Sequence, residues 1–262
     1  MRLALAFLFS ATTSRAMSTF TTASSKVRLG LCQIAVTPNK EKNIANMRTQ
    51  LGIAKAKGAQ LVSLPECWNS PYSNAAFPKY AEAVPKVGEQ PSEATNPSVH
   101  ALCNEAKNLG IWLVGGSIPE RENDKLFNTC VFINPEGSIV GKHRKVHLFD
   151  IDVPGKIRFM ESESLTPGNE VTVVSTPWGG VGIGICYDIR FPEYAILMRQ
   201  KGEVYQNFVY HFRSNCSSYP SLTFITSQGA NIFIYPGAFN MVTGPAHWEL
   251  LQRARAMDNN GK

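Results

Sequence analysis

The sequence predicts one α/β domain in which helices are layered against β-sheets. Two kinds of segment alternate along the chain. Some have alternating or continuous apolar residues, as strands do, and the others have apolar residues that recur at helical spacing. A strong hairpin signal, the turn at residues 134–137, separates two of the strand-like segments. Strands that alternate with helices in this way favour a layered α/β domain over a helical bundle or a β-sandwich.

The individual elements follow from hydrophobic periodicity. Residues 39–57, for example, carry Ile44, Met47, Leu51 and Ala54 on one helical face and predict an amphipathic helix. The predicted helices are 39–57, 95–109, 192–201 and 245–257, and the predicted strands are 27–34, 60–64, 111–115, 126–133, 138–145, 171–174, 181–186 and 231–235.

Composition and charge exclude several classes of protein. Of the 262 residues, 44% are hydrophobic and 18% are charged, which excludes an intrinsically disordered chain. The longest apolar run, residues 3–9, is far shorter than the roughly 20 residues that a membrane-spanning helix needs. The net charge is +6, but the basic residues are scattered apart from a cluster at 142–145. We therefore expect neither a nucleic-acid nor a membrane partner.

Residues 1–25 have the composition of an organelle transit peptide. They contain ten Ser or Thr residues, Arg2 and Arg15, and no acidic residue. The sequence therefore predicts a targeting segment for a mitochondrion or plastid at 1–25 and a catalytic domain at 26–262. A secretory signal is the rival interpretation, and a start at Met17 would leave the protein in the cytoplasm.

Three residues of complementary chemistry follow predicted strands. Cys186 ends a strand that begins in a glycine-rich run, where backbone amides and a following helix would stabilise a thiolate. Glu66 follows an apolar strand and suits a general base, and Lys145 ends the hairpin strand. Open α/β sheets build their sites at strand ends. A nucleophile, a proton shuttle and a cation for an oxyanion are therefore expected together.

Other motifs do not predict a site. His143 and His147 lie four residues apart, but on a predicted strand we expect them to point to opposite sides, so no metal is expected. The glycine run at 179–184 lacks the order of a dinucleotide-binding loop, so no cofactor is expected. The six cysteines include no C-x-x-C pair, and most of them lie in apolar runs typical of buried thiols.

Four stretches of the chain resemble the carbon–nitrogen hydrolase (nitrilase) superfamily. They are residues 63–72 (SLPECWNSPY), 144–156 (RKVHLFDIDVPGK), 184–191 (GICYDIRF) and 244–251 (GPAHWELL). The second and fourth closely resemble the omega-amidase branch. The resemblance implies an α-β-β-α sandwich with a catalytic triad of Glu66, Lys145 and Cys186. A second family glutamate, which helps to hold the lysine and the substrate, falls on Glu161.

The activity that the resemblance implies is hydrolysis of the terminal amide of a 2-oxo acid, such as 2-oxoglutaramate or 2-oxosuccinamate, through a cysteine thioester. In that scheme the Tyr187 N–H joins Lys145 in binding the oxyanion. Arg190 is a candidate for the substrate carboxylate, although a structural ion pair is an equally good interpretation. The resemblance implies a small-molecule amide substrate, no cofactor and no metal.

Two departures from the family pattern leave other functions open. Residues 203–229 are unusually aromatic and look inserted. From the resemblance we also expect that the family's C-terminal strands and dimer contacts are missing. A retained intron would account for both, and the family homo-oligomer would be weakened. The alternatives are therefore another amidase of the superfamily, namely a nitrilase or an N-carbamoyl amidase, or a truncated member without activity.

Overall fold

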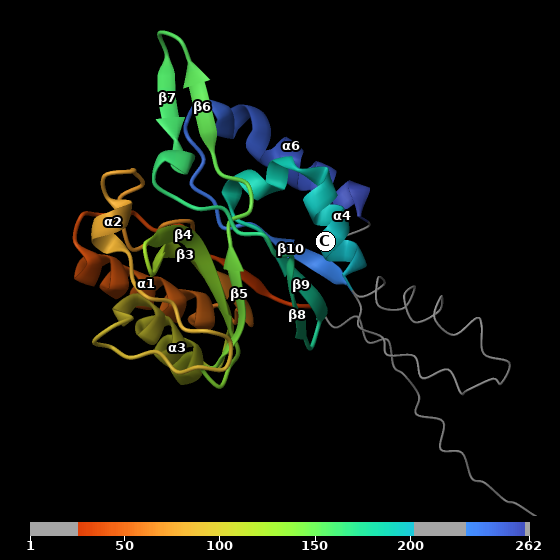
Figure 1. The fold of residues 1–262 in the computed structure, drawn as a ribbon. Coiled ribbons are helices and arrows are strands. Elements are labelled where there is room, and N and C mark those ends of the chain that lie inside the picture. The colour runs from red at the N-terminus through yellow and green to blue at the C-terminus, as the bar shows by residue number, and fades with distance from the viewer. Residues whose placement is uncertain (1–25, 202–228, 260–262) are drawn as a thin grey trace, which may run out of the picture.

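The computed structural model describes residues 26–201 and 229–259, which are arranged in four layers in the order helix, sheet, sheet, helix (Figure 1). The elements are β1 Leu29–Leu31, α1 Lys40–Ala56, β2 Leu61–Ser63, α2 Phe77–Tyr80, α3 Pro97–Leu109, β3 Trp112–Glu122, β4 Lys125–Ile133, β5 Ile139–Arg144, β6 Asp150–Val153, β7 Ile157–Met160, β8 Thr172–Thr176, β9 Gly179–Ile183, α4 Pro192–Gln200, β10 Ala230–Ile234 and α6 Thr243–Asp258. Two short 3₁₀ helices, Glu161–Glu163 and Cys186–Arg190, complete them.

Two sheets form the centre of the domain. The larger sheet has the strand order β1-β2-β3-β4-β5, in which β1 to β3 are parallel and β3 to β5 are antiparallel. Parallel neighbours need a crossover connection, which α1 and α3 supply. The smaller sheet has the described order β10-β9-β8, with β9 parallel to β10. The parallel strands β2 and β9 are the ones that lead directly to Glu66 and Cys186.

Three apolar clusters hold the layers together. One lies between the larger sheet and helices α1 and α3, and includes Met47, Leu102 and Ile133. A second lies between the two sheets and joins Phe132 to Ile183, and a third packs α4 onto the smaller sheet. The α-β-β-α arrangement implied by the resemblance is therefore confirmed for the described part of the chain.

Local signals in the sequence placed the boundaries well where a capping or turn residue is present. The side chain of Asn39 accepts a hydrogen bond from the Lys42 N–H at 2.6 Å and so caps the start of α1. The predicted hairpin turn is also confirmed, because Gly137 has a φ of +81° and its N–H donates to the Asn134 carbonyl at 2.9 Å.

Several elements differ from the prediction: β3 extends to Glu122 beyond the strand expected at 111–115, and the short helix α2 was not predicted. The strand expected at 181–186 ends at Ile183, and a 3₁₀ helix lies between it and α4. The β6–β7 hairpin was missed, and it projects from the domain above the rest of the molecule (Figure 1). Its strands have four residues each and their side chains are mostly exposed, so they lack the apolar alternation by which a strand is recognised.

Several sequence predictions lie outside the described residues. They are the targeting segment at 1–25, the insertion at 203–229 except for Gly229, and the last three residues of the chain. Among the residues that the structure describes, no helix is both long enough and apolar enough to cross a membrane.

Candidate active site

The loop that carries Glu66 is fixed by an irregular part of β3. The Ser117 N–H donates to the carbonyl of Pro65 at 3.1 Å. Gly116 has a φ of +64°, and a Cβ at this position would collide with the same carbonyl oxygen. Only glycine allows this close approach without strain. The bulged strand therefore holds Glu66 in one place, directly after the buried strand β2.

Lys145 lies between two carboxylates at the centre of the site. Its Nζ is 2.8 Å from Oε1 of Glu66 and 2.9 Å from Oε2 of Glu161, and all three side chains are fully buried. Burial alone would lower the pKa of Lys145, but the negative charges of Glu66 and Glu161 outweigh it and hold this pKa well above its usual value. The lysine is therefore a permanent buried cation.

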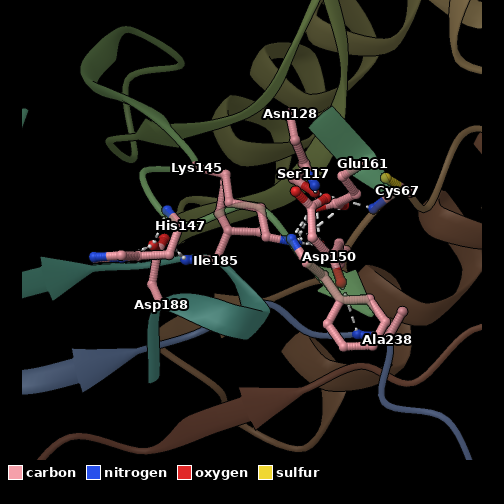
Figure 2. Close-up of polar contacts among 12 residues, drawn as sticks. Cys67, Ser117, Asn128, Lys145, His147, Asp150, Glu161, Ile185, Asp188 and Ala238 are labelled. Atoms are coloured by element: carbon pink, nitrogen blue, oxygen red, sulfur yellow. Dashed lines mark hydrogen bonds and ion pairs between the residues drawn. The ribbon is translucent and has the colours of Figure 1, made fainter. Parts of the chain in front are cut away.

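The Glu66 carboxylate is held by two further donors. Asn128 Nδ2 donates to Oε1 at 2.9 Å, and the backbone N–H of Ala238 donates to Oε2 at 3.1 Å. The carbonyl of Asn128 also accepts from the Lys145 N–H at 2.8 Å. Figure 2 shows Asn128, Lys145 and Glu161 gathered at one point with Ala238 beyond them. Strand β4 of the larger sheet and the segment that follows β10 of the smaller sheet thus fix the position of this carboxylate.

The Glu161 carboxylate is also held by two donors, one from a side chain and one from the backbone. Tyr72 Oη donates to its Oε1 at 2.6 Å, and the Phe149 N–H donates to its Oε2 at 2.7 Å. Burial raises the pKa of Glu161 and the nearby charge of Glu66 adds to this, against the opposing effect of Lys145. Two carboxylates that share one cation therefore make this cluster short of positive charge.

Cys186 occupies a sharp turn between β9 and the 3₁₀ helix that it begins. Its φ is +45°, in the left-handed region that few residues other than glycine adopt. Its N–H donates to the Pro236 carbonyl at 2.8 Å, which ties the turn to the chain after β10. Backbone strain of this kind is concentrated at functional sites. The turn directs the half-buried thiol towards Glu66 and the Ala238 N–H.

The resting thiol is held in its neutral form. Burial raises the pKa of Cys186 well above its usual value, and the negative charge of Glu66 raises it further, while Lys145 and the Ala238 N–H act in the opposite direction. The expectation that backbone amides and a helix dipole would favour a thiolate was therefore wrong. The 3₁₀ helix has only five residues, and burial beside a carboxylate outweighs it. A base must take the proton as the sulfur attacks.

Tyr187 follows Cys186 directly at the start of the 3₁₀ helix. It is the second residue of the 3₁₀ helix, and N–H groups in the first turn have no acceptor within a helix. Its ring packs edge-on against Phe149 and Phe191, with ring centres 5.3 and 5.7 Å apart. The packing fixes the residue whose N–H was predicted to bind an oxyanion.

Arg190 lies at the other end of the same 3₁₀ helix, among aromatic groups. Its guanidinium is 5.6 Å from the ring centre of Tyr187 and 5.7 Å from that of Phe239, and both terminal nitrogens lie 3.3 Å from Nδ1 of His247. Within residues 26–201 and 229–259 it forms no ion pair with a carboxylate. The structural ion pair considered from the sequence is therefore absent from the described contacts.

The two histidines that were expected to point apart reach the same carboxylate. His147 Nδ1 is 2.7 Å from Oδ1 of Asp188, and His143 Nε2 is 3.4 Å from its Oδ2. The expectation was wrong because an even separation keeps side chains on one side of a strand, and β5 ends at Arg144 between the two. No group of three metal-ligating side chains occurs in the part of the chain that is described.

Sequence reasoning missed four contributors to the site. Tyr72 and Asp188 lie inside the stretches that carry the family resemblance, so attention to their polar groups would have found them. Asn128 is a buried polar residue in an otherwise mostly apolar strand, which is a detectable signal. Ala238 contributes only a backbone N–H, for which the side chain gives no signal.

Comparison with known proteins agrees with this geometry. The family model of the carbon–nitrogen hydrolases matches residues 28–221. The omega-amidase NIT2 of Xenopus tropicalis is 49% identical over 89% of this chain and 71% of its own length. The chloroplastic omega-amidase of Arabidopsis thaliana is 48% identical over 89% of this chain, but the match spans only 55% of that protein.

A solved structure extends the similarity to the fold. Nit3 of Saccharomyces cerevisiae, a member of branch 10 of the nitrilase superfamily, superposes with a TM-score of 0.70 at 39% identity, over 90% of this chain and 73% of that one. The family model covers most of the chain, and the relatives agree with the four-layer fold. The chain belongs to the carbon–nitrogen hydrolase (nitrilase) superfamily, in its omega-amidase branch.

Proposed function

We propose that this chain is an omega-amidase that hydrolyses the terminal amide of a 2-oxo acid such as 2-oxoglutaramate or 2-oxosuccinamate. The observation that carries the proposal is the Cys186 thiol facing a buried Glu66–Lys145–Glu161 cluster. The names of the relatives supply the substrate class, since several of them are omega-amidases. The products are the dicarboxylic 2-oxo acid and ammonia.

The first half of the reaction transfers the acyl group to sulfur. Glu66 takes the thiol proton as the sulfur of Cys186 attacks the amide carbon, which suits a thiol that is neutral at rest. Lys145 and the Tyr187 N–H bind the oxyanion that forms. Protonated Glu66 then gives its proton to the amide nitrogen, the carbon–nitrogen bond breaks, and ammonia leaves a thioester behind.

The second half of the reaction releases the acid. Glu66, again ionised, takes a proton from a water molecule, whose oxygen attacks the thioester carbon. The carbon–sulfur bond breaks from the tetrahedral intermediate and the proton returns to the sulfur. Glu161 stays in contact with Lys145 through both halves and keeps the ammonium in place. One acid–base group thus serves both steps.

Arg190 accounts for the preference for an acid as substrate. A guanidinium that pairs with no carboxylate of the described residues, and that follows the nucleophile by four residues, is suited to grip the carboxylate beside the 2-oxo group. The aromatic rings of Tyr187 and Phe239 flank this half-buried guanidinium, and partial burial strengthens its attraction for a carboxylate.

The deciding experiment is ammonia release from 2-oxoglutaramate by the full chain and by Cys186→Ala. We expect release by the parent and a loss of about 10⁴-fold or more in the variant, because the nucleophile is gone. A nitrile and an N-carbamoyl amino acid are offered in parallel to test the two alternative activities. Equal release by Cys186→Ala would contradict the mechanism, and a folded parent inert on all three substrates would favour the inactive alternative.

The substrate preference is tested with Arg190→Gln. We expect KM for 2-oxoglutaramate to rise about 10- to 100-fold, since a charge-assisted hydrogen bond contributes about 1.5–3 kcal/mol. An uncharged amide of similar size is the control, and its slower hydrolysis should be the same in both proteins. An equal loss on both amides would instead give Arg190 a structural role.

The compartment is proposed from residues 1–25. Their composition is that of a transit peptide, and a plant relative is named as chloroplastic, which supports an organelle. Fusion of residues 1–25 to a fluorescent protein tests this, because diffuse cytoplasmic fluorescence would contradict the proposal.

A further inference from the structure

We propose that Asp188 is a positioning residue that fixes the distance between the Lys145 ammonium and the Cys186 thiol. It rests on the proposed function in one respect, namely that these two groups act on the same reacting carbon. Asp188 itself is fully buried and follows the nucleophile by two residues.

The Asp188 carboxylate bonds to the backbone on both sides of the site. Asp188 Oδ2 accepts from the Ile185 N–H at 2.8 Å, and Ile185 immediately precedes Cys186. Asp188 Oδ1 accepts from the His147 N–H at 2.8 Å, and His147 follows Lys145 by two residues. The segments of Lys145 and Cys186 thus meet at one side chain, and the contact between His147 and Asp188 spans 41 residues of the chain.

Contacts from two histidine rings strengthen the link that Asp188 makes between the two segments. His147 Nδ1 donates to Asp188 Oδ1 at 2.7 Å, and His143 Nε2 lies 3.4 Å from Oδ2. His143 precedes Lys145 by two residues, so the lysine is held on both sides. Figure 2 shows His147, Asp188 and Ile185 as a separate group beside the group that contains Lys145.

The Asp188 carboxylate is ionised. Burial alone would raise the pKa of Asp188, but its bonds to His143 and His147 outweigh this and hold the pKa well below its usual value. The group is therefore an acceptor only, and every one of its contacts is with a donor. Such a link is rigid, because neither oxygen can exchange its partners without leaving a buried donor unsatisfied.

The consequence is that Asp188 acts through the geometry of other groups. A displacement of about 1 Å between a nucleophile and the group that stabilises its oxyanion can cost about 10²-fold in rate. The turn at Cys186 adopts a left-handed conformation that the surroundings must enforce. Asp188 enforces it through Ile185 and sets it relative to Lys145 at the same time.

The principal test is Asp188→Asn. An amide has one acceptor atom and one donor atom, so in either orientation it presents an N–H to the Ile185 side or to the His147 side. We expect kcat for 2-oxoglutaramate to fall about 10- to 100-fold, while KM stays within about twofold of the parent because Arg190 is untouched. Alkylation of Cys186 by iodoacetamide should slow about tenfold, since Lys145 no longer assists the sulfur.

The matched control is Tyr194→Phe. Tyr194 Oη contacts the same buried network through His143, at 3.4 Å, and donates to the Ile183 carbonyl at 3.0 Å, but it bonds to neither Ile185 nor His147. We expect Tyr194→Phe to lower Tm about as much as Asp188→Asn does, while its kcat stays within about twofold of the parent. A merely structural role for Asp188 predicts the same kcat loss in both variants, and that result would overturn the proposal.

A milder variant keeps the proposal testable if Asp188→Asn does not fold. His147→Phe preserves the stack on Phe191, whose ring centre is 3.6 Å away, and removes only the ring donor. We expect kcat to fall about 3- to 10-fold with KM unchanged, and an unchanged kcat would overturn the proposal. Alkylation needs no amide substrate, so it tests the link between Asp188 and Cys186 even if 2-oxoglutaramate is not hydrolysed.

Discussion

Two buried ion clusters occupy neighbouring residues at the end of β5, and they differ in charge balance. Lys142 and Arg144 both bind Glu120, at 2.5 and 2.7 Å, so that this buried carboxylate meets two cations, and Arg144 also pairs with the more exposed Glu122 at 2.9 Å. The next residue, Lys145, binds the two carboxylates Glu66 and Glu161, so that one cation serves two anions. The lysines and the arginine come from β5 and the residue after it, whereas Glu120 lies on β3, Glu66 follows β2, and Glu161 begins a 3₁₀ helix.

The difference in balance separates a structural cluster from a chemical one. Burial alone would raise the pKa of Glu120, but hydrogen bonds from Arg144 and Lys142 outweigh it and lower the pKa. At Glu161 burial and Glu66 prevail over Lys145, and the pKa is raised. A carboxylate with surplus cations holds its charge at all ordinary pH values. A cluster that lacks positive charge is suited to exchange protons, as a catalytic site requires.

We expect the largest difference between the two clusters when one lysine is removed from each. In Lys145→Met we expect kcat/KM for 2-oxoglutaramate to fall about 10²- to 10³-fold, the usual effect of losing one oxyanion donor. Stability should also fall by about 3–5 kcal/mol, because two buried carboxylates lose their only shared cation. Ammonia release and urea unfolding measure the two effects.

Lys142→Met is the matched control for that variant. It removes the same charge from the neighbouring cluster, where Glu120 keeps Arg144 as a partner at 2.7 Å. We expect kcat/KM to stay within about twofold of the parent. A comparable loss of activity in both variants would show that the two clusters act as one, and the distinction drawn from their charge balance would fail.

The next largest expected effect is the pH dependence of the stability that Glu120 and Glu161 contribute. The folded pKa of Glu120 lies below its usual value of 4.5, so its stabilisation is present above that pH and is lost as the pH falls towards the folded pKa. The folded pKa of Glu161 lies above 4.5, so the free energy of unfolding decreases as the pH rises through the interval between the two values.

Glutamine substitutions separate these two contributions. Glu120→Gln should lose about 2–4 kcal/mol at pH 7, keep its activity, and have a flatter acid limb in a plot of stability against pH. Glu161→Gln has one acceptor oxygen, which can keep the bond from the Phe149 N–H while the Tyr72 hydroxyl turns to accept from the new amide, so we expect its stability at pH 7 within about 1 kcal/mol of the parent. Its kcat should fall about 10- to 100-fold. Thermal unfolding between pH 3 and 8 would contradict this if both variants lost stability equally.

Only part of each cluster could be predicted from the sequence. Strand and helix positions followed from periodicity, and Glu66, Lys145 and Cys186 followed from their places at strand ends together with the family resemblance. Periodicity reports the burial of apolar faces, and it therefore also located the layers of the domain. It has no signal for the exposed β6–β7 hairpin, whose base positions Glu161 through Phe149.

The charge state of the site was beyond the sequence for a different reason. A pKa depends on which groups meet after folding, so the local surroundings of Cys186 favoured a thiolate while the folded surroundings favour a neutral thiol. The partners Asn128 and Ala238 lie 62 and 172 residues from Glu66 along the chain. Contacts at such separations are set by topology, which one sequence does not specify residue by residue.

The smallest effect that still tests the comparison is at Tyr72, whose hydroxyl donates to Glu161 Oε1 at 2.6 Å. In Tyr72→Phe the Glu161 carboxylate loses a hydrogen-bond donor and interacts more strongly with Lys145. The lysine then stabilises an oxyanion less well. We expect kcat to fall about 3- to 10-fold, with a stability loss of about 1 kcal/mol. Tyr80→Phe is the control, because Tyr80 Oη donates to the Pro38 carbonyl, also at 2.6 Å, away from the site. If kcat were the same in both variants, the number of donors around Glu161 would not matter, and the cluster's shortage of positive charge would be a feature of its structure without a role in its chemistry.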